Sequence, residues 1–336
     1  FAWRKPNGRT TSQKIMSGPL IYDRGMRNST QAYTDKAVIK IILEKLTDQH
    51  VFINTTWISK DPDLENVVSK NKIAVCYSGS DWENTNDGPL RRDAHQYIKD
   101  NSKDVIHIGN TRGKHYFNWC SESVRRHQEG FFDQRYIANP EFDKVYMCLN
   151  RQPHTHRKFL FQALKSNALL DKGLVSFADE LNIEENLDAR LVRIGEQVSF
   201  GMNIKNDILS LGDVKNWSRC LINVVTETTV HTDFMITEKT WKPIIGMRPF
   251  LILGDQYVYP HLKQSGFDTF DDIFGTWWQD SNWQNRANSI VSILKSFDVK
   301  DCQSFYKDNE SRLMHNRELF IKYMQENHEK IKTLEI

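Results

Sequence analysis

Thr237, Glu238 and Lys239 are the residues of this sequence best suited to bind a charged ligand. Threonine favours the position before a helix, so Glu238 and Lys239 are expected in the first helical turn. The backbone N–H groups of that turn have no partner within the helix, and with the lysine they suit an anion such as a diphosphate. The carboxylate beside the lysine can accept hydrogen bonds from a ribose diol, as acidic residues do in dinucleotide-binding folds.

A second candidate binding segment places Asn150 at the end of an expected strand and Arg157 in the first turn of the following helix. A cation in that turn is disfavoured by the helix dipole unless an anion lies beside it. Arginine binds phosphate oxygens through paired hydrogen bonds and keeps its charge. We therefore predict that Arg157 binds phosphate, with Arg151 as the alternative. His154 and His156 lack acidic or cysteine neighbours at ligand spacing, so no metal site is expected there.

Apolar runs rich in β-branched residues are expected to form the strands that position these segments. Uninterrupted runs of this kind are typical of strands buried on both faces of a parallel sheet. In the second half of the chain the expected strands are residues 145–149, 174–177, 221–225 and 250–253, with helices at 156–167, 283–296 and 304–332. Glu227 follows the third of these strands, at the edge where parallel sheets bind ligands, and is a further candidate contact.

The first half shows a similar alternation of strands and helices. Helices are expected at 35–46 and 61–69, and strands at 51–57, 73–77 and 105–109. Such alternation favours a parallel sheet covered on both faces. The turn signal Asn139-Pro140 then marks a boundary between a domain of residues 1–140 and a domain of residues 141–336.

The composition of the chain argues against a nucleic-acid-binding, disulfide-rich or membrane-spanning protein. The chain has 336 residues, 39% of them hydrophobic, which is sufficient for two packed cores. Its 45 basic and 43 acidic residues are balanced, so a dedicated nucleic-acid-binding surface is not expected. Five scattered cysteines favour reduced core thiols over a disulfide framework. No apolar run approaches the ~20 residues that span a bilayer, and no signal peptide is evident, so we expect a cytoplasmic protein.

Several motifs together resemble a known family. This part of the chain resembles the nucleotide-sugar half of α-1,3-fucosyltransferase-like enzymes and their phage and bacterial relatives. The shared motifs are an acidic residue after a strand, the pair Asp233-Phe234, the run 237–239, and then glycine and proline before the next strand. The resemblance covers residues 143–274. It implies the GT-B fold, with two Rossmann-like domains whose parallel sheets face across a cleft. Pro243 lies inside the expected helix, which must therefore be short or kinked.

The resemblance also implies roles for individual residues. In that family the glutamate of Thr-Glu-Lys binds the ribose and the lysine binds the diphosphate, which implies these roles for Glu238 and Lys239. A strand–Asn–turn–Arg arrangement supplies the arginine that binds the diphosphate, and Arg157 matches it after Asn150. The implied activity is inverting, metal-independent transfer from a GDP-fucose-like donor to a glycan, a protein or a modified base. No cofactor besides the sugar nucleotide is expected.

Inverting sugar transfer requires a base for the acceptor hydroxyl. Asp81 and Glu83, in the turn after the strand 73–77, are the first candidates, followed by His107. Asp61 and Asp63 resemble a metal-binding Asp-x-Asp motif, but an N-cap and an acidic first turn explain them. Two rival hypotheses remain: a metal-dependent transferase built on that motif, and a catalytically idle nucleotide-sugar-binding or virion-associated module.

Overall fold

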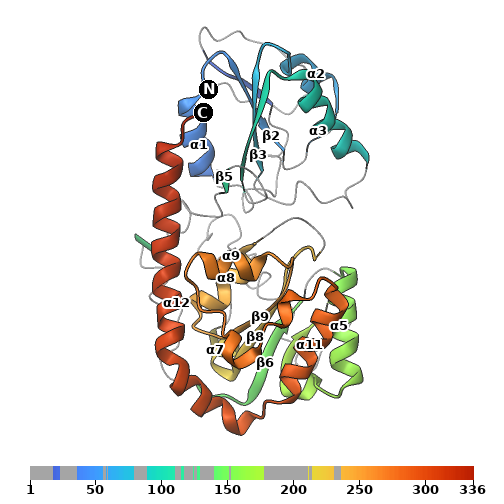
Figure 1. Ribbon diagram of the computed structural model, residues 1–336, viewed down its shortest axis with the longest axis vertical. Coiled ribbons are helices and arrows are strands. Elements are labelled where there is room, and N and C mark those ends of the chain that lie inside the picture. Colours follow the sequence, from blue (N-terminus) through green and yellow to red (C-terminus); the bar gives the residue numbers. More distant parts are fainter. Residues whose placement is uncertain are drawn as a thin grey trace.

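The computed structural model of the protein describes residues 18–22, 36–55, 58, 60–78, 89–109, 115–116, 124, 127–128, 140–150, 153–177, 211, 214–230 and 236–336. Within these residues the chain is an α/β structure with two parallel sheets, one of five strands and one of four. The strands of the first sheet precede residue 140 and those of the second sheet follow it. Figure 1 shows the two sheets in separate lobes, the first above the second. The predicted α/β class is therefore confirmed.

The first sheet has the parallel strand order β1-β2-β3-β4-β5. Its strands are β1 (Leu20–Tyr22), β2 (His50–Asn54), β3 (Ile73–Ser78), β4 (Asp104–Gly109) and β5 (His115–Tyr116). Alternate side chains of a strand face opposite sides of a sheet. Phe52 and Val75 pack in one hydrophobic cluster with α1 (Lys36–Lys45). Val51 and Ala74 pack in another with α2 (Pro62–Val67) and α3 (Pro89–Asn101). Helices thus cover both faces.

The second sheet has the parallel order β7-β6-β8-β9. Its strands are β6 (Lys144–Leu149), β7 (Gly173–Ser176), β8 (Cys220–Thr226) and β9 (Phe250–Leu253). All four match predicted strands to within one residue at each end. β6 pairs with both β7 and β8, so the chain passes from one side of β6 to the other after β7. Such a reversal of strand order is a topological switch point, where open α/β sheets bind ligands beyond the carboxyl ends of the strands.

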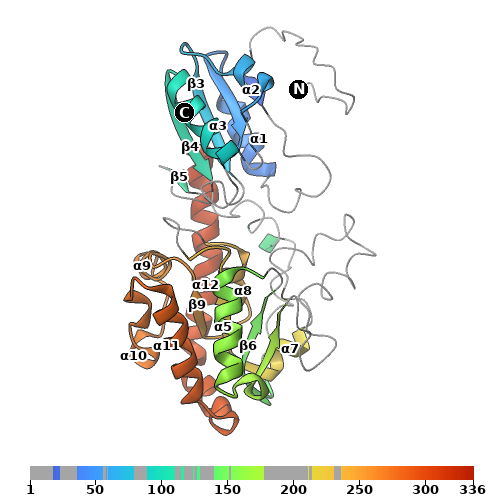
Figure 2. The ribbon, with the colours of Figure 1, turned by 90° about the vertical axis from the view of Figure 1, so that its right-hand side faces the viewer.

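Helices from different parts of the chain cover the two faces of this sheet. The residues of β9 divide between two clusters: Phe250 and Ile252 pack with α8 (Glu238–Ile245), whereas Leu251 and Leu253 pack with α5 (Thr155–Ser166) and α11 (Trp283–Lys295). Figure 2 shows α5 and α11 side by side, in agreement with their contact. The remaining helices are α7 (Val214–Arg219), α9 (Val258–Gln264) and α10 (Asp271–Phe274), with single turns at η3 (Leu170–Lys172) and η5 (Trp277–Gln279). The helices that follow β6 and β8 therefore lie on opposite faces.

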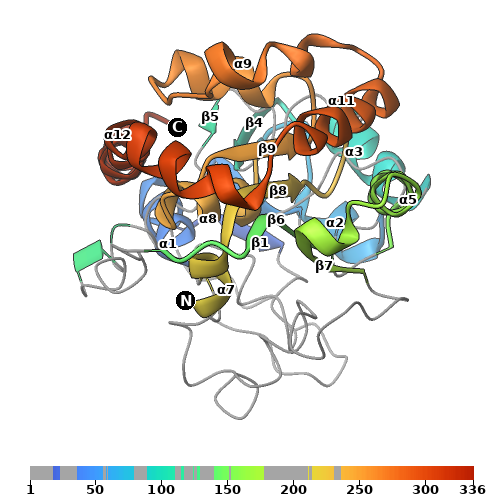
Figure 3. The same ribbon diagram turned by 90° about the horizontal axis from the view of Figure 1, so that it is seen from below.

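The last helix, α12 (Val299–Thr333), has 35 residues and runs from the lobe of the second sheet to the lobe of the first (Figure 1). Its buried residues recur every three or four positions, which is the spacing of one narrow helix face. Phe320 packs on Trp241 of α8 with ring centroids 5.6 Å apart. Near the end of the helix, the Lys332 carbonyl accepts a hydrogen bond of 2.7 Å from Lys45 Nζ of α1. The helix α12 thus contacts α8 at the candidate site and α1 beside the first sheet. Seen from below, α12 and α5 lie at opposite sides of the second sheet (Figure 3).

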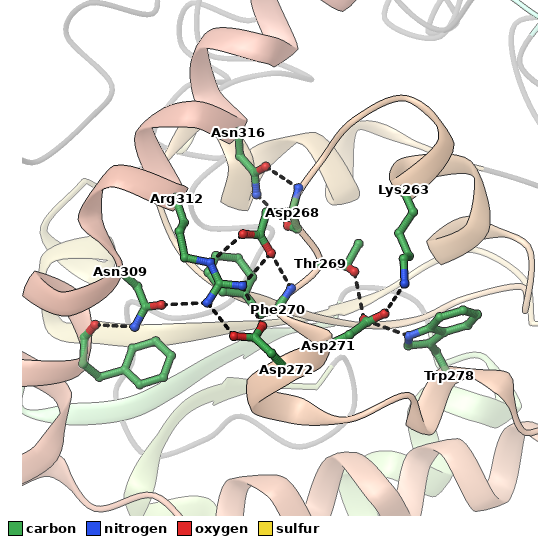
Figure 4. A network of polar contacts seen from close by, with 11 residues as sticks. Lys263, Asp268, Thr269, Phe270, Asp271, Asp272, Trp278, Asn309, Arg312 and Asn316 are labelled. Atoms are coloured by element: carbon green, nitrogen blue, oxygen red, sulfur yellow. Dashed lines mark hydrogen bonds and ion pairs between the residues drawn. The ribbon is translucent and has the colours of Figure 1, made fainter.

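Arg312 of α12 fixes the loop between α9 and α10 (Figure 4). Its guanidinium forms paired hydrogen bonds with the carboxylate of Asp268, at 2.5 and 2.8 Å, and with that of Asp272, at 2.7 and 3.1 Å. Asn316 bonds both the backbone N–H and the carbonyl of Asp268, at 2.7 and 2.8 Å. The guanidinium also lies 4.6 Å from the ring centroid of Phe270, which has a φ of 58°. Contacts from α12 thus stabilise a left-handed conformation that is unfavourable for phenylalanine.

Candidate functional site

The candidate site lies at the carboxyl ends of β6 and β8, at the switch point of the second sheet. Asn150 follows β6 and is buried, and Glu227 follows β8 and is fully buried. The two strand ends are joined directly, because the hydroxyl of Thr226 donates a hydrogen bond to Oδ1 of Asn150. The Asn150 amide in turn donates to Cys148 Sγ at 3.3 Å. Asn150 therefore joins the carboxyl ends of the two central strands, β6 and β8. This contact fixes the sheet edge after which the segments leading to α5 and α8 begin.

Thr237 begins α8 as predicted. It occupies the N-cap position in an extended conformation, and its hydroxyl accepts a hydrogen bond from the backbone N–H of Lys239 at 3.4 Å. The helix has only eight residues and Gly246 is its C-cap, so Pro243 is accommodated by a short helix. The predicted capped turn with Glu238 and Lys239 is confirmed.

The carboxylate of Glu227 organises this helix start. Oε1 accepts from the backbone N–H of Thr237 at 3.0 Å and from the hydroxyl of Thr240 at 2.6 Å. Oε2 accepts from the hydroxyl of Thr237 at 2.5 Å. Glu227 has no exposed surface. Its carboxylate thus satisfies helix-start donors that have no intrahelical partner, and its effect on a ligand is exerted through the position of α8.

Lys239 of α8 makes several polar contacts at the site. Its Nζ lies 3.0 Å from the hydroxyl of Thr237, 3.1 Å from Glu238 Oε1 and 3.5 Å from the hydroxyl of Thr228. Its side chain remains 31% exposed, whereas that of Glu238 is 14% exposed. An ammonium group that is held by oxygen atoms and still reaches solvent is suited to bind an anion from outside.

Glu238 stays ionised at this position. Burial alone would raise the pKa of its carboxyl group, but the charges of Lys239 and Lys242 and the hydrogen bond from Lys239 outweigh that effect and lower the pKa to about 2. At neutral pH the carboxylate is therefore a hydrogen-bond acceptor only. It can therefore bind hydrogen-bond donors of a ligand, such as the hydroxyl groups of a ribose.

Arg157 approaches the same strand end from α5. It is 4% exposed, and its Nη2 donates hydrogen bonds to the backbone carbonyls of Thr226 at 3.1 Å and Glu227 at 3.2 Å. His156 lies 2.8 Å from the Glu227 carbonyl through its Nε2. A carbonyl only accepts, so this nitrogen carries the hydrogen. Arg157 and Lys239 thus approach the same strand end from helices on opposite faces of the sheet. Arg157 binds the Glu227 carbonyl, and Lys239 binds Thr237, which is hydrogen-bonded to the Glu227 carboxylate.

Arg286 of α11 is a positioning residue that the sequence did not reveal. It is 2% exposed and donates to the carbonyls of Gly254 at 2.8 Å, Asp280 at 3.0 Å and Val230 at 3.5 Å. Gly254, after β9, lies so close to Glu227 that an added Cβ would be 3.3 Å from Glu227 Cγ. Arg286 thus fixes the segment after β8 and the end of β9. Its only sequence signal was an arginine inside the expected helix 283–296.

The other sequence candidates do not contribute to the described part of this cluster. Asp81, Glu83, Arg151 and Asp233 fall outside the residues that the structure describes. His107 is in β4, two residues before the strand ends, and burial lowers its pKa below the usual value.

The capping explanation of the Asp-x-Asp motif is confirmed. Asp61 is the N-cap of α2, and its Oδ1 accepts from the backbone N–H of Leu64 at 2.9 Å. Its Oδ2 accepts from the hydroxyl of Tyr22 at 2.9 Å. Asp63 lies in the first turn of the same helix.

Two tryptophans near the start of α11, of a residue type on which sugar faces can stack, contribute to packing. Trp278 is 8% exposed and stacks on Tyr259 with ring centroids 5.4 Å apart and an interplanar angle of 2°. Trp283 is also 8% exposed and packs edge-on against Phe159 of α5 at 5.3 Å. Large buried aromatic pairs of this kind stabilise the contacts between helices. These two indoles are therefore core residues rather than surfaces for an acceptor.

Replacing Glu227 with glutamine is expected to lower the free energy of unfolding by about 1–3 kcal/mol. The substitution replaces one acceptor oxygen with an amide donor that faces the donors of Thr237 and Thr240. Urea denaturation measures the change. Glu326 on α12, which is exposed and 3.9 Å from Lys322, provides the control, because loss of such a surface pair costs less than about 1 kcal/mol. Equal losses for Glu227→Gln and Glu326→Gln would contradict the assigned role.

The search for a membrane-spanning helix, the cysteines and the comparisons with known proteins do not identify what this site binds. No helix in the described part of the chain is long and apolar enough to cross a membrane. Four cysteines, Cys76, Cys148, Cys220 and Cys302, are buried free thiols, as predicted, and Cys120 lies outside the described residues. Comparisons of the chain with protein-family models, with curated proteins and with solved structures found no match.

Proposed function

We propose that this protein is a glycosyltransferase that takes a sugar from a nucleotide-diphosphate donor and transfers it to an acceptor hydroxyl with inversion. The observation that carries the proposal is the convergence of Arg157 and Lys239 on the end of β8, at the switch point of the second sheet. Two cations supplied by two helices that begin at one sheet edge match the charge of a diphosphate.

The neighbouring groups support a nucleotide as the carrier of that diphosphate. The ionised Glu238 lies 3.1 Å from Lys239 Nζ, so a ligand that places its phosphates on the lysine can place the adjoining ribose hydroxyls on the carboxylate. A fully ionised inorganic anion such as sulfate has no hydrogen to donate to an acceptor there. The pairing of a donor group with an acceptor-only group therefore favours a nucleoside diphosphate over an inorganic anion. The resemblance to fucosyltransferases favours a GDP-sugar among these donors.

We further propose a GT-B arrangement in which the first sheet contributes the acceptor side. Two parallel sheets, each with helices on both faces, are consistent with two Rossmann-like domains. In this proposal Asp81 or Glu83 takes the proton from the acceptor hydroxyl as the bond to the anomeric carbon forms and the nucleoside diphosphate leaves. The cations at Arg157 and Lys239 stabilise the charge of the leaving group. Transfer is proposed to be metal-independent, because in this proposal Arg157 and Lys239 bind the phosphates directly.

A thermal-shift screen tests this proposal. The protein is heated with GDP-, UDP- and dTDP-sugars in the presence of EDTA, with a CMP-sugar as the single-phosphate comparison. One of the three diphosphate classes is expected to raise the melting temperature. A ligand at one hundred times its Kd stabilises the folded state by about 2.7 kcal/mol. The stabilising donor is then assayed for release of its nucleoside diphosphate with glycan, protein and modified-base acceptors. Failure of every class to stabilise the protein at millimolar concentration would overturn the proposal, and turnover that requires Mn²⁺ would overturn its metal-independent part.

A further inference from the structure

His154 is a titratable group at the proposed site to which the proposed function assigns no role. It is the N-cap residue of α5, five residues after the end of β6, and its side chain makes no capping hydrogen bond. The ring is half-buried and stacks on that of His156, with centroids 5.8 Å apart and an interplanar angle of 4°. His156 is itself buried and engaged with the Glu227 carbonyl. Of the two histidines, His154 is therefore the one that solvent and ligands can reach.

The charged groups that act on His154 come from two helices. Arg157 belongs to its own helix, α5, and Lys239 belongs to α8. Burial and these two positive charges lower the pKa of His154 below its usual value, so the ring is neutral at pH 7. The nearest acidic side chain on α8, Glu238, is paired with Lys239 at 3.1 Å. His154 thus lies within the field of the two residues that are proposed to bind the diphosphate.

We propose that His154 is a third, protonated ligand of the diphosphate, so that binding of a nucleotide sugar takes up one proton. The inference rests on the proposed function for the identity of its ligand. Each of the two phosphates of a nucleotide sugar carries one negative charge, and their arrival beside Arg157 and Lys239 reverses the local field. The imidazole then gains a proton and donates a charge-assisted hydrogen bond to a phosphate oxygen.

The direction of the pH dependence follows from linkage. The pKa of His154 is low in the free protein and is raised by the bound anion, so affinity increases as the pH falls through the pKa of the complex. Affinity levels off below the pKa of the free protein, where both states are protonated. Each pH unit between the two pKa values corresponds to about tenfold in Kd. The proposal therefore predicts tighter binding at about pH 5.5 than at about pH 8.

Isothermal titration calorimetry with GDP-fucose, and with UDP-glucose as the second probe, tests the inference. Both donors are diesters whose phosphates do not titrate in this range, so a pH dependence belongs to the protein. The parent is expected to bind about tenfold or more tightly at the lower pH. Titrations in two buffers of different ionisation enthalpy measure the proton uptake. His154→Gln should bind weakly and His154→Lys tightly, and neither should show the pH dependence.

His315→Gln is the matched control. His315 is exposed on α12 and lies 3.1 Å from the Gly266 carbonyl, far along the chain from the proposed ligands, so its loss should leave the pH dependence intact. A parent affinity that does not change with pH, or a pH dependence that persists in His154→Gln, would overturn this inference and leave the proposed function standing. If neither probe binds the parent at any pH, the inference falls, whereas the proposed function falls only if no class of nucleotide sugar stabilises the protein.

Discussion

Replacement of Lys239 or Arg157 by alanine is expected to weaken nucleoside diphosphate binding by about 2–5 kcal/mol, or roughly 30- to 5,000-fold in Kd. Lys239 Nζ lies among three oxygen atoms and its side chain is 31% exposed, so it can meet a phosphate without rearrangement of α8. Arg157 is 4% exposed, which places its charge in a largely desolvated position where electrostatic interactions are strong. Calorimetric titration of both variants with GDP and UDP measures the loss.

Lys158→Ala provides the control for this prediction. Lys158 follows Arg157 in α5 but is exposed, so the variant removes the same unit of charge from a solvated position. Its effect should stay within about 1 kcal/mol. Because Arg157 also binds the carbonyls of Thr226 and Glu227, its variant is first compared with the parent in urea, and Lys239→Ala carries the decision if Arg157→Ala is unstable. Unchanged binding of both nucleotides to both variants would show that the anion site is misplaced.

The second half of the fold could be predicted because its strands are buried on both faces. β9 is apolar throughout, and β8 is apolar except for Asn223 and its last residue, Thr226. A threonine and a glycine mark the start and end of the helix between them. Burial of both faces removes the polar alternation that makes single-sided strands ambiguous. Local rules for capping and termination then place α8, because they depend on neighbouring residues only.

The first half was predicted less completely, for a related reason. The prediction missed α3, whose residues 93–101 bury only Ala94 and Ile98 as hydrophobic side chains, a pair that gives too weak a helical period to recognise. It also missed β1 and β5, which have three and two residues and form the edges of the sheet. The strand expected at 51–57 ends at Asn54. Edge strands and amphipathic helices depend on tertiary contacts that a short window of sequence does not contain.

The candidate site combines predictable and unpredictable parts. The positions of Asn150, Arg157, Thr237, Glu238 and Lys239 relative to their elements followed from local signals. The role of Glu227 did not, because its partners Thr237 and Thr240 lie ten and thirteen residues away and the intervening chain sets their approach.

Buried arginines were the least predictable residues of all. Arg248 is 1% exposed and donates hydrogen bonds to the backbone carbonyls of residues 217, 220, 246 and 247, at distances of 2.6 to 3.1 Å. Those carbonyls lie at the ends of α7 and α8, where helices present acceptors that have no intrahelical partner. No sequence motif marks such partners, because every residue type supplies the same carbonyl group. The same reasoning applies to Arg286.

Glu83→Gln is expected to reduce kcat by about 10²–10⁴-fold, which is the usual consequence of losing a general base. The residue follows β3, and a carboxylate beyond the end of a parallel strand is where the proposed architecture would meet the acceptor. Donor binding is assigned to the second sheet, so the dissociation constant of the nucleotide should stay at the parental value. Asp81→Asn, two residues earlier, is the paired variant. Steady-state rates and nucleotide titrations of both variants separate the two quantities.

The outcomes of this pair distinguish the remaining hypotheses. If both variants keep the parental kcat, the assignment to this turn is wrong, and His107 becomes the next candidate ahead of Glu227, whose carboxylate is fully buried and holds α8. A pH profile identifies that case, because burial lowers the pKa of His107 and its rate limb would lie below pH 6.5. A parent that binds the donor but transfers no sugar to any acceptor would favour the idle binding module. In that event Lys239 and Arg157 still govern affinity, because their charges act on the donor whether or not a base completes the reaction.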